Sequence, residues 1–313
     1  MKVIGMCFAL ALALILRAES GPPSPEDIAR FWRDTRDRLA AEPLDAVVEL
    51  TKDALPYRKF RVTLRGLGGV RFRAYLAVPV HGESPAVPLP AVITAPGYGG
   101  WQQGIMLDEC QRGFVILQVF PRSQGESEEF WKIDGPEKLT WGLARPEGYY
   151  YQGAYSDILR GVDFLVSRPE VDPNRIGIMG TSQGGGIALA VASLDSRIRA
   201  ASAHLPCLCD MRRAAGMPGS LANTRLTKAG ANGPAAWNTL DYFDPARLAS
   251  NLRAPALISA GGKDVTCPAQ TIRAVYDRIA GIKSLVSYPD LPHTTSHGFY
   301  VLSWAWMEMY LKP

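Results

Sequence analysis

From Ala91 onward the chain alternates short apolar runs with stretches of helical periodicity. Short apolar runs without polar alternation are typical of strands buried on both faces, and the helical stretches between them supply the covering layers. This alternation predicts an α/β fold with a mostly parallel central sheet covered by helices on both faces. The predicted strands are residues 91–95, 114–119, 176–179, 200–203, 256–260 and 284–288, and the predicted helices lie near Ile105 and over 155–167, 185–194, 268–280 and 299–311.

The segment before the alternation has a different texture. Ser24 is a suitable cap for a helix that starts at Pro25 and runs to about residue 41. Residues 60–65 and 71–78 then alternate with the two-residue period of strands, separated by a glycine-rich turn. We therefore expect an N-terminal helix followed by an antiparallel hairpin at one edge of the sheet.

The first 20 residues resemble an export signal. Lys2 precedes an apolar run from 3 to 16, and Ala18-Glu19-Ser20 offers small residues at a cleavage site. The apolar run has about 14 residues, fewer than the roughly 20 that span a bilayer, so a retained anchor followed by Arg17 is the weaker alternative. We predict a signal peptide over 1–20, a single catalytic domain over 21–313, no stable membrane anchor, and a secreted or periplasmic location.

The charge balance argues against nucleic acid as a partner. The formal net charge is +4, with 34 basic and 30 acidic residues, and no long basic run is present.

Four cysteines remain after a signal peptide is removed, namely Cys110, Cys207, Cys209 and Cys267. An even number in an exported chain permits disulfides, but their pairing cannot be deduced from sequence. Cys207-Leu208-Cys209 has no second half that would complete a metal site, and we predict no metal.

Two segments do not fit the alternation, residues 121–148 and 207–245. Both are expected to be long loops that follow strand ends. Long loops in this position are usually functional, because α/β enzymes build their sites at the carboxyl ends of the strands.

Gly180-Thr181-Ser182-Gln183-Gly184 fits the pattern G-x-S-x-G between an apolar strand and a helix rich in glycine and alanine. This arrangement predicts the sharp nucleophile turn of the α/β-hydrolase fold. Ser182 is then the nucleophile, and the N–H of Gln183 at the start of the helix is one donor to an oxyanion. The second donor is expected from the loop after the first parallel strand, where the Tyr98 N–H is our candidate.

A serine nucleophile needs a base, and the chain has four histidines. His81 lies before the sheet begins, and His204 precedes any suitable acid in a fold whose order is Ser, Asp or Glu, His. His293 and His297 both follow the last strand. We favour His293, because His297 is expected to begin the final helix with Thr295 or Ser296 as its cap.

The acid that orients the histidine should follow a strand between the serine and the histidine. Asp264 does so, at the end of the strand 256–260, and would fix the imidazole tautomer. These residues predict ester hydrolysis by acyl transfer, a reaction that needs no metal or organic cofactor.

Several segments together resemble the acetyl xylan esterase and cephalosporin C deacetylase family of the α/β-hydrolases. The resemblance covers most of the chain after residue 20, and its most specific parts are Phe31-Trp32, Pro96-Gly97-Tyr98, Tyr149-Tyr150-Tyr151 through Asp157 and Arg160, the run 180–186, and Asp264 with Thr266. It implies a Ser182–Asp264–His293 triad, Tyr98 and Gln183 as oxyanion donors, a small acetylated saccharide or similar ester as substrate, and a homo-oligomer. Trp131, Trp141 and the three tyrosines could then pack at a subunit interface, stack on a sugar, or form a local core.

The chain departs from the family pattern at two places. Arg122-Ser123-Gln124 stands where the family usually has Arg-Gly-Gln, and Thr294 stands where its histidine is followed by Glu. The Arg and Gln that brace the site are kept, but Ser123 adds a side chain to a tight turn.

The alternatives within the same fold are a peptidase of the prolyl-oligopeptidase type and a general short-chain esterase. The peptidase class normally carries a propeller before the hydrolase domain, and about 70 residues between the signal and the first parallel strand are too few for blades of about 45 residues. A hydrolase that has lost its activity and serves for binding would lack a triad member, and here all three residue types are present in order.

Overall fold

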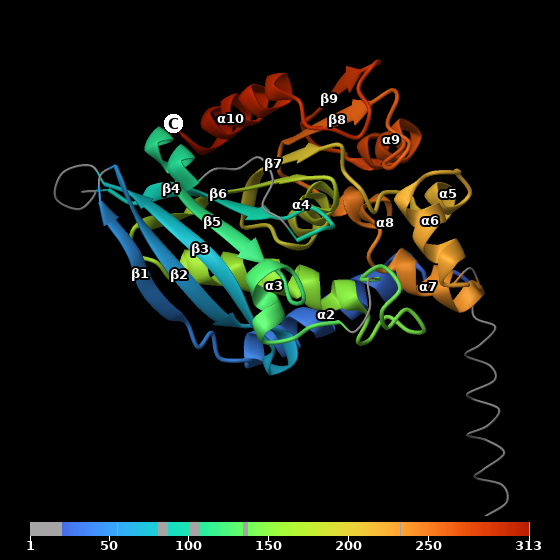
Figure 1. The fold of residues 1–313 in the computed structure, drawn as a ribbon, viewed down its shortest axis with the longest axis horizontal. Helices are drawn as coiled ribbons and strands as arrows, with labels where there is room; N and C mark the ends of the chain where they lie inside the picture. Colours follow the sequence, from blue (N-terminus) through green and yellow to red (C-terminus); the bar gives the residue numbers. More distant parts are fainter. Residues whose placement is uncertain are drawn as a thin grey trace, which may run out of the picture.

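A nine-stranded sheet forms the centre of the molecule, with helices on both faces (Figure 1). The computed structural model describes residues 21–54, 56–80, 87–100, 107–133, 137–231 and 233–312. The strands are β1 (Val47–Ala54), β2 (Tyr57–Arg65), β3 (Arg71–Pro79), β4 (Leu89–Ala95), β5 (Val115–Phe120), β6 (Val171–Thr181), β7 (Ile198–His204), β8 (Ala256–Gly261) and β9 (Lys283–Tyr288). The helices are α2 (Pro25–Ala41), α3 (Tyr150–Val166), α4 (Gln183–Leu194), α5 (Met211–Ala215), α6 (Leu221–Lys228), α7 (Pro234–Asp241), α8 (Pro245–Leu248), α9 (Ala269–Arg278) and α10 (His297–Leu311), with short 3-10 turns η1 (Leu67–Gly69), η2 (Leu107–Arg112), η3 (Gly125–Glu129) and η4 (Ala249–Asn251).

The strand order is β1-β2-β3-β5-β4-β6-β7-β8-β9. The six strands predicted from the alternation are β4 to β9, and they pair in parallel. The predicted hairpin is β2 and β3, but β1 pairs outside it, so the edge is an antiparallel three-stranded unit. Because β5 lies on one side of β4 and β6 on the other, the strand order reverses at β4, where α/β proteins place their ligand crevice.

The two faces of the sheet are buried under different helices. Val92, Ile116 and Met179 point toward one face and form a smaller core with Trp304 and Met307 of α10. The neighbouring residues along the same strands join a larger core on the other face with side chains of α2, α3 and α4. Figure 1 shows α10 above the sheet and α3 and α2 below it. Burial on both faces explains why these strands are continuous apolar runs.

Helix α2 has the bounds that its sequence predicts. The Ser24 side chain accepts the Asp27 N–H, and the Asp27 carboxylate accepts the Ser24 N–H, which makes a capping box. Trp32 stacks on Tyr155 of α3 with ring centroids 5.7 Å apart and donates its indole N–H to the carbonyl of Tyr242. The helix is therefore attached to α3 rather than to the sheet itself.

The two segments expected to be long loops contain helical structure. Residues 207–245 include α5, α6 and α7, and residues 121–148 include η3. Local start signals were present in the sequence: Ser220 accepts the Asn223 N–H as the cap of α6, and Pro234 is the first residue of α7. These helices were missed because they have about eight residues or fewer, too short for a clear apolar period.

Three predictions fall outside the described residues: the signal peptide over 1–20, the helix near Ile105, and the loop around His81. Within the described residues, no helix combines the length and the apolar character needed to cross a membrane.

A buried ion pair fixes the loop that follows β5. Arg122 donates to both carboxylate oxygens of Asp157 on α3, over 3.0 and 2.7 Å, and its backbone N–H donates to the same carboxylate over 2.8 Å. The Asp157 side chain is fully buried and that of Arg122 is 10% exposed. The guanidinium also donates to the carbonyl of Leu67, so one charged group connects the turn between β2 and β3, the β5 loop and α3.

Asp157→Asn is expected to lower the free energy of unfolding by about 3–5 kcal/mol, because it leaves the buried Arg122 charge uncompensated. Glu49→Gln is the matched control, since Glu49 pairs with Arg61 at an exposed site and should lose less than about 1 kcal/mol. Denaturant unfolding followed by circular dichroism measures both. Equal losses of unfolding free energy in the two variants would show that the buried ion pair contributes no more to stability than the exposed one.

Candidate active site

The carboxyl ends of three parallel strands bring the predicted serine, acid and histidine together. Ser182 follows β6, Asp264 follows β8 and His293 follows β9. The Nε2 atom of His293 lies 3.0 Å from the Ser182 Oγ, and its Nδ1 atom lies 2.8 Å from the Asp264 Oδ2. Because Nδ1 faces a carboxylate, it carries the proton, and Nε2 faces the serine hydroxyl as an acceptor.

The turn that carries Ser182 is strained and tightly packed. Ser182 has a φ of 57° and lies immediately before α4. A Cβ atom on Gly184 would lie 2.2 Å from the carbonyl oxygen of Ala95, and one on Gly180 would lie 2.2 Å from the Gly184 carbonyl. Both glycines are therefore required by close backbone contacts, as the G-x-S-x-G pattern predicts.

The Asp264 side chain is held by a backbone hydrogen bond within its own loop. Its side chain is fully buried, and its second oxygen accepts the Cys267 N–H over 2.8 Å. The neighbouring Lys263 N–H donates to the carbonyl of Leu291, two residues before His293. A backbone hydrogen bond and the Asp264–His293 contact thus both join the loops after β8 and β9.

His297 has the place that the sequence predicts for it. It is the first residue of α10, and Ser296 caps the helix by accepting the Phe299 N–H. Its side chain is exposed, whereas that of His293 lies between Asp264 and Ser182.

The two candidate oxyanion donors come from the start of α4 and from the loop after β4. Gln183 is the first residue of α4, where a backbone N–H has no partner within the helix. Tyr98 lies in the loop after β4, and its hydroxyl accepts the Leu139 N–H over 3.1 Å. Burial raises the pKa of Tyr98 to about 12, so this hydroxyl stays protonated.

Two glutamine side chains brace the loop that carries Tyr98. Gln183 donates to the Gln124 side chain over 3.1 Å and accepts the Tyr151 hydroxyl over 2.8 Å. Gln124 in turn donates to the carbonyls of Gly97 and Tyr98, each over 3.2 Å. The Gln183 side chain therefore helps to hold the Tyr98 loop, a role that the sequence pattern did not predict for it.

Ser123, which departs from the pattern of the family that the sequence resembles, adopts a φ of 58°. Its hydroxyl accepts the Ile133 N–H over 2.9 Å. The added side chain is thus accommodated in a left-handed conformation and used as an acceptor.

His204, which the order of residues in this fold excludes as the base, lies beside the site. It ends β7, its carbonyl accepts the Ser182 N–H over 2.9 Å, and its ring is buried. Burial lowers the pKa of His204 to about 4, so the ring is neutral near pH 7. No sequence pattern marked this residue, because its partners are far away along the chain.

Among the described residues, one group has the donor atoms for a metal ion: Asp264, Cys267 and His293, whose ligand atoms lie within 4.8 Å of one another. Two of the three already bond to each other. Burial raises the pKa of Cys267 well above its usual value, and a protonated thiol is a poor metal ligand. The group fits proton transfer better than metal binding.

The cysteines within the described residues and the tyrosine triplet 149–151 belong to the protein interior. Cys110, Cys207, Cys209 and Cys267 are buried free thiols. Tyr149, Tyr150 and Tyr151 are each 1% exposed, which favours the local core over an interface or a sugar platform. Trp131 and Trp141 instead pack edge to face near the surface, and Trp141 is 40% exposed.

Comparison with known proteins places this geometry in a family. The family model for acetyl xylan esterase matches residues 6–308. The acetyl esterase Axe7A of Xylanibacter ruminicola is 31% identical over 92% of this chain and 68% of its own length. An acetyl xylan esterase from Paenibacillus superposes with a TM-score of 0.84 at 29% identity, covering 96% of this chain and 99% of its own.

A second solved structure, acetyl xylan esterase 1 from Thermoanaerobacterium, has a TM-score of 0.84 at 25% identity, covering 95% of this chain and 96% of its own. An acylaminoacyl peptidase from Pyrococcus horikoshii, with a TM-score of 0.61 at 19% identity over 82% of this chain and 42% of its own, shares the fold alone. The expected α/β-hydrolase fold is confirmed. The chain belongs to the acetyl xylan esterase family and is a carboxylic ester hydrolase.

Proposed function

We propose that this chain is an exported serine esterase that removes acetyl groups from small acetylated saccharides. The observation that carries the proposal is the placement of the His293 ring, 3.0 Å from the Ser182 hydroxyl and 2.8 Å from the Asp264 carboxylate. Such a histidine can accept the serine proton and remain stabilised by the acid. Membership of the acetyl xylan esterase family supports the acetyl ester as the substrate.

In the proposed reaction, the Ser182 Oγ attacks the carbonyl carbon of the acetyl ester while His293 Nε2 takes the hydroxyl proton. The negative charge that develops on the carbonyl oxygen is stabilised by the N–H groups of Tyr98 and Gln183 and by the positive end of α4. His293 then gives that proton to the sugar oxygen as the bond between this oxygen and the acetyl carbon breaks, which leaves a sugar hydroxyl and an acetyl ester of Ser182. Water, activated by the same histidine, hydrolyses the acetyl-enzyme and releases acetate.

Ser182→Ala is expected to lower the rate of acetate release from acetylated xylo-oligosaccharides by at least about 10³-fold, because it removes the nucleophile. Acetate is measured directly, and a circular dichroism spectrum checks that the variant folds. Ser193→Ala, a buried serine on α4 that donates only to the carbonyl of Leu189, is the matched control and should keep wild-type activity. An unchanged rate in Ser182→Ala would remove this serine from the mechanism.

The same assay with p-nitrophenyl esters of increasing acyl length separates the substrate from the chemistry. Serine-dependent release that is strongest for acetyl groups supports the deacetylase. Serine-dependent release only from longer acyl chains would keep the triad and discard the acetyl saccharide. Serine-dependent cleavage of peptides but not of esters would favour the peptidase alternative.

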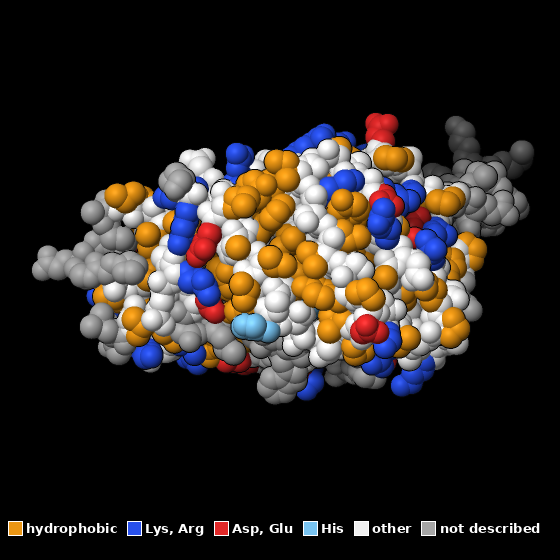
Figure 2. All heavy atoms as spheres, turned by 90° about the horizontal axis from the view of Figure 1, so that it is seen from above, with side chains coloured by type: hydrophobic (Ala, Val, Ile, Leu, Met, Phe, Trp, Pro, Cys, Tyr) orange, Lys and Arg blue, Asp and Glu red, His pale blue; other side chains and the backbone are white. Residues whose placement is uncertain are grey.

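We also propose that the chain assembles into a homo-oligomer through the outer face of α10. Val301, Leu302 and Met309 on this helix are 51%, 45% and 68% exposed. Figure 2 shows hydrophobic side chains gathered on the upper surface of the molecule, the side on which α10 lies in Figure 1. Exposed apolar area of this kind is typical of surfaces that pack against a partner.

Leu302→Glu with Met309→Glu is expected to convert the oligomer to a monomer, because each places a charge in the apolar contact. Size-exclusion chromatography with light scattering gives the mass. Leu50→Glu, at an exposed position on β1, is the control and should not change it. A wild-type protein of monomer mass contradicts the proposal, and an oligomer that survives in the double variant excludes α10 as its interface.

Export is proposed from the segment over 1–20. When the full chain is produced in a bacterial host, the mature protein is expected to begin near Gly21 and to be recovered from the periplasm or the medium. N-terminal sequencing and cell fractionation measure both properties. A chain without residues 3–16 should stay in the cytosol, and an uncleaved, cytosolic wild type would show that the segment is not a signal.

A further inference from the structure

His204 makes two contacts that the catalytic mechanism does not use, one to each side of the site. Its backbone carbonyl accepts the N–H of Ser182 over 2.9 Å. Its side chain accepts, through Nε2, the backbone N–H of Ser296 over 3.0 Å. Ser296 lies three residues after His293, so one residue of β7 holds both the nucleophile turn and the loop of the base.

The hydrogen bonds fix the tautomer of His204. Because Nε2 accepts the Ser296 N–H, the ring proton lies on Nδ1, which donates to the Ser259 Oγ at 2.6 Å. Ser259, on β8, also accepts the N–H of Leu205 over 3.0 Å. Ser259 therefore orients the imidazole so that its acceptor nitrogen faces the loop after His293.

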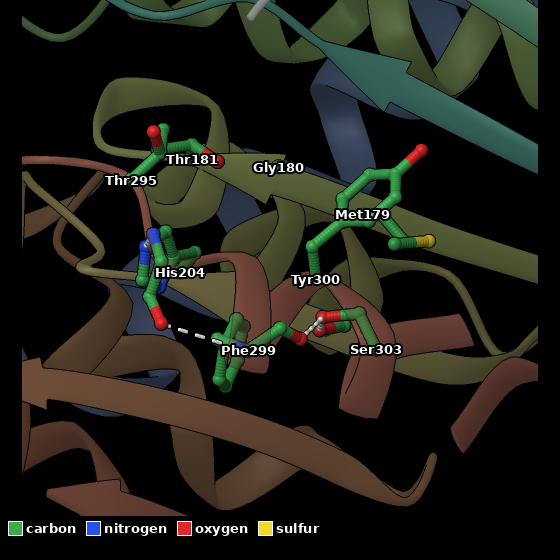
Figure 3. Close-up of a pocket in the computed structure, with 10 residues that line it drawn as sticks. Met179, Gly180, Thr181, His204, Thr295, Phe299, Tyr300 and Ser303 are labelled. Atoms are coloured by element: carbon green, nitrogen blue, oxygen red, sulfur yellow. Dashed lines mark hydrogen bonds between the residues drawn. The ribbon is translucent and has the colours of Figure 1, made fainter. Parts of the chain in front are cut away.

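Packing holds the same ring from the other side. The imidazole stacks on Phe299 of α10, with ring centroids 4.7 Å apart and an angle of 18° between the planes. Figure 3 shows His204 between Thr295 and Phe299, beside a cavity of about 50 Å³ that also touches Thr181. Each ring nitrogen thus has one hydrogen-bond partner and one face of the ring packs on Phe299, so the imidazole is held in a single orientation.

We infer that His204 is a positioning residue: it ties the loop after β9 to the nucleophile turn and sets the distance between His293 and Ser182. His204 reaches no substrate and transfers no proton. Its effect passes through the backbone of Ser296 to the place of His293. The inference rests on the proposed triad, because only there does the His293–Ser182 distance set a rate.

The first test compares two substitutions of His204. His204→Phe keeps an aromatic ring that can stack on Phe299, and the adjoining cavity gives the larger ring room, but it removes the acceptor for the Ser296 N–H. We expect kcat per active site to fall by about 10- to 100-fold with KM unchanged, since a small displacement of a catalytic group can cost about 10²-fold. His204→Gln restores an acceptor near the position of Nε2 and is expected to recover most of that loss.

Active sites are counted by the burst of p-nitrophenol from p-nitrophenyl acetate, so that misfolded molecules do not enter kcat. Ser182 reactivity toward a fluorophosphonate, which also depends on the base, should fall in parallel with kcat in His204→Phe. Ser202→Ala is the matched control: it is buried on the same strand two residues away, and its hydroxyl bonds Ser303 rather than the loop of the base. It should leave kcat within about twofold of wild type.

The possible results distinguish a failure of the positioning role of His204 from a failure of the proposed esterase function. Loss in His204→Phe with recovery in His204→Gln supports the positioning role. Wild-type kcat per active site in His204→Phe, even with fewer active sites, overturns it. An equal fall of kcat per active site in His204→Phe and His204→Gln also overturns it, because the restored acceptor would then have no effect. If the wild type itself releases no acetate, or if Ser182→Ala retains its activity, the proposed function fails instead, whatever the His204 variants do.

Discussion

The backbone at Ser182 is held at a positive φ, and the positions of the neighbouring loops depend on that turn. Hydrogen bonds from Ser182 N–H to the His204 carbonyl, and from the Cys207 and Gly186 N–H groups to the Ser182 carbonyl, offset the strain. The missing side chain at Gly184 lets the turn approach the end of β4. The turn of the serine therefore packs against the end of β4; the loop that follows β4 carries one candidate oxyanion donor, and α4 carries the other.

Buried polar contacts hold the surrounding loops at that distance. The ion pair of Arg122 and Asp157 holds the segment after β5, and Gln124 in that segment donates a hydrogen bond to the loop of Tyr98. Gln183 joins the same network from α4. Buried hydrogen-bonding groups must find partners, so a network in which each group has one favours a single arrangement of the loops. The site is thus held by side chains that do not take part in the proposed chemistry.

The features that the sequence predicted well depend on local or periodic signals. The cap at Ser24, the doubly buried strands and the glycines around Ser182 each follow from residues close together in the chain. The features it missed lack a clear apolar period, even where a local start signal is present. Strand β1 carries exposed residues such as Leu50, and an edge strand of this kind shows no apolar alternation. Helices α5 to α7 are too short for a clear period.

By itself the sequence determined the α/β class, the sharp turn at Ser182, and the order in which the candidate serine, acid and histidine occur, because these rest on residue type, spacing and chain order. Only the tertiary structure decided which histidine faces Ser182. His293 and His297 are four residues apart, and His297 is exposed at the residue where α10 begins, whereas His293 lies in the loop before the helix. The tertiary structure also decided the place of His204, whose partners Ser259 and Ser296 lie 55 and 92 residues away. Contacts at such separations arise from strand order and packing, which no local pattern records.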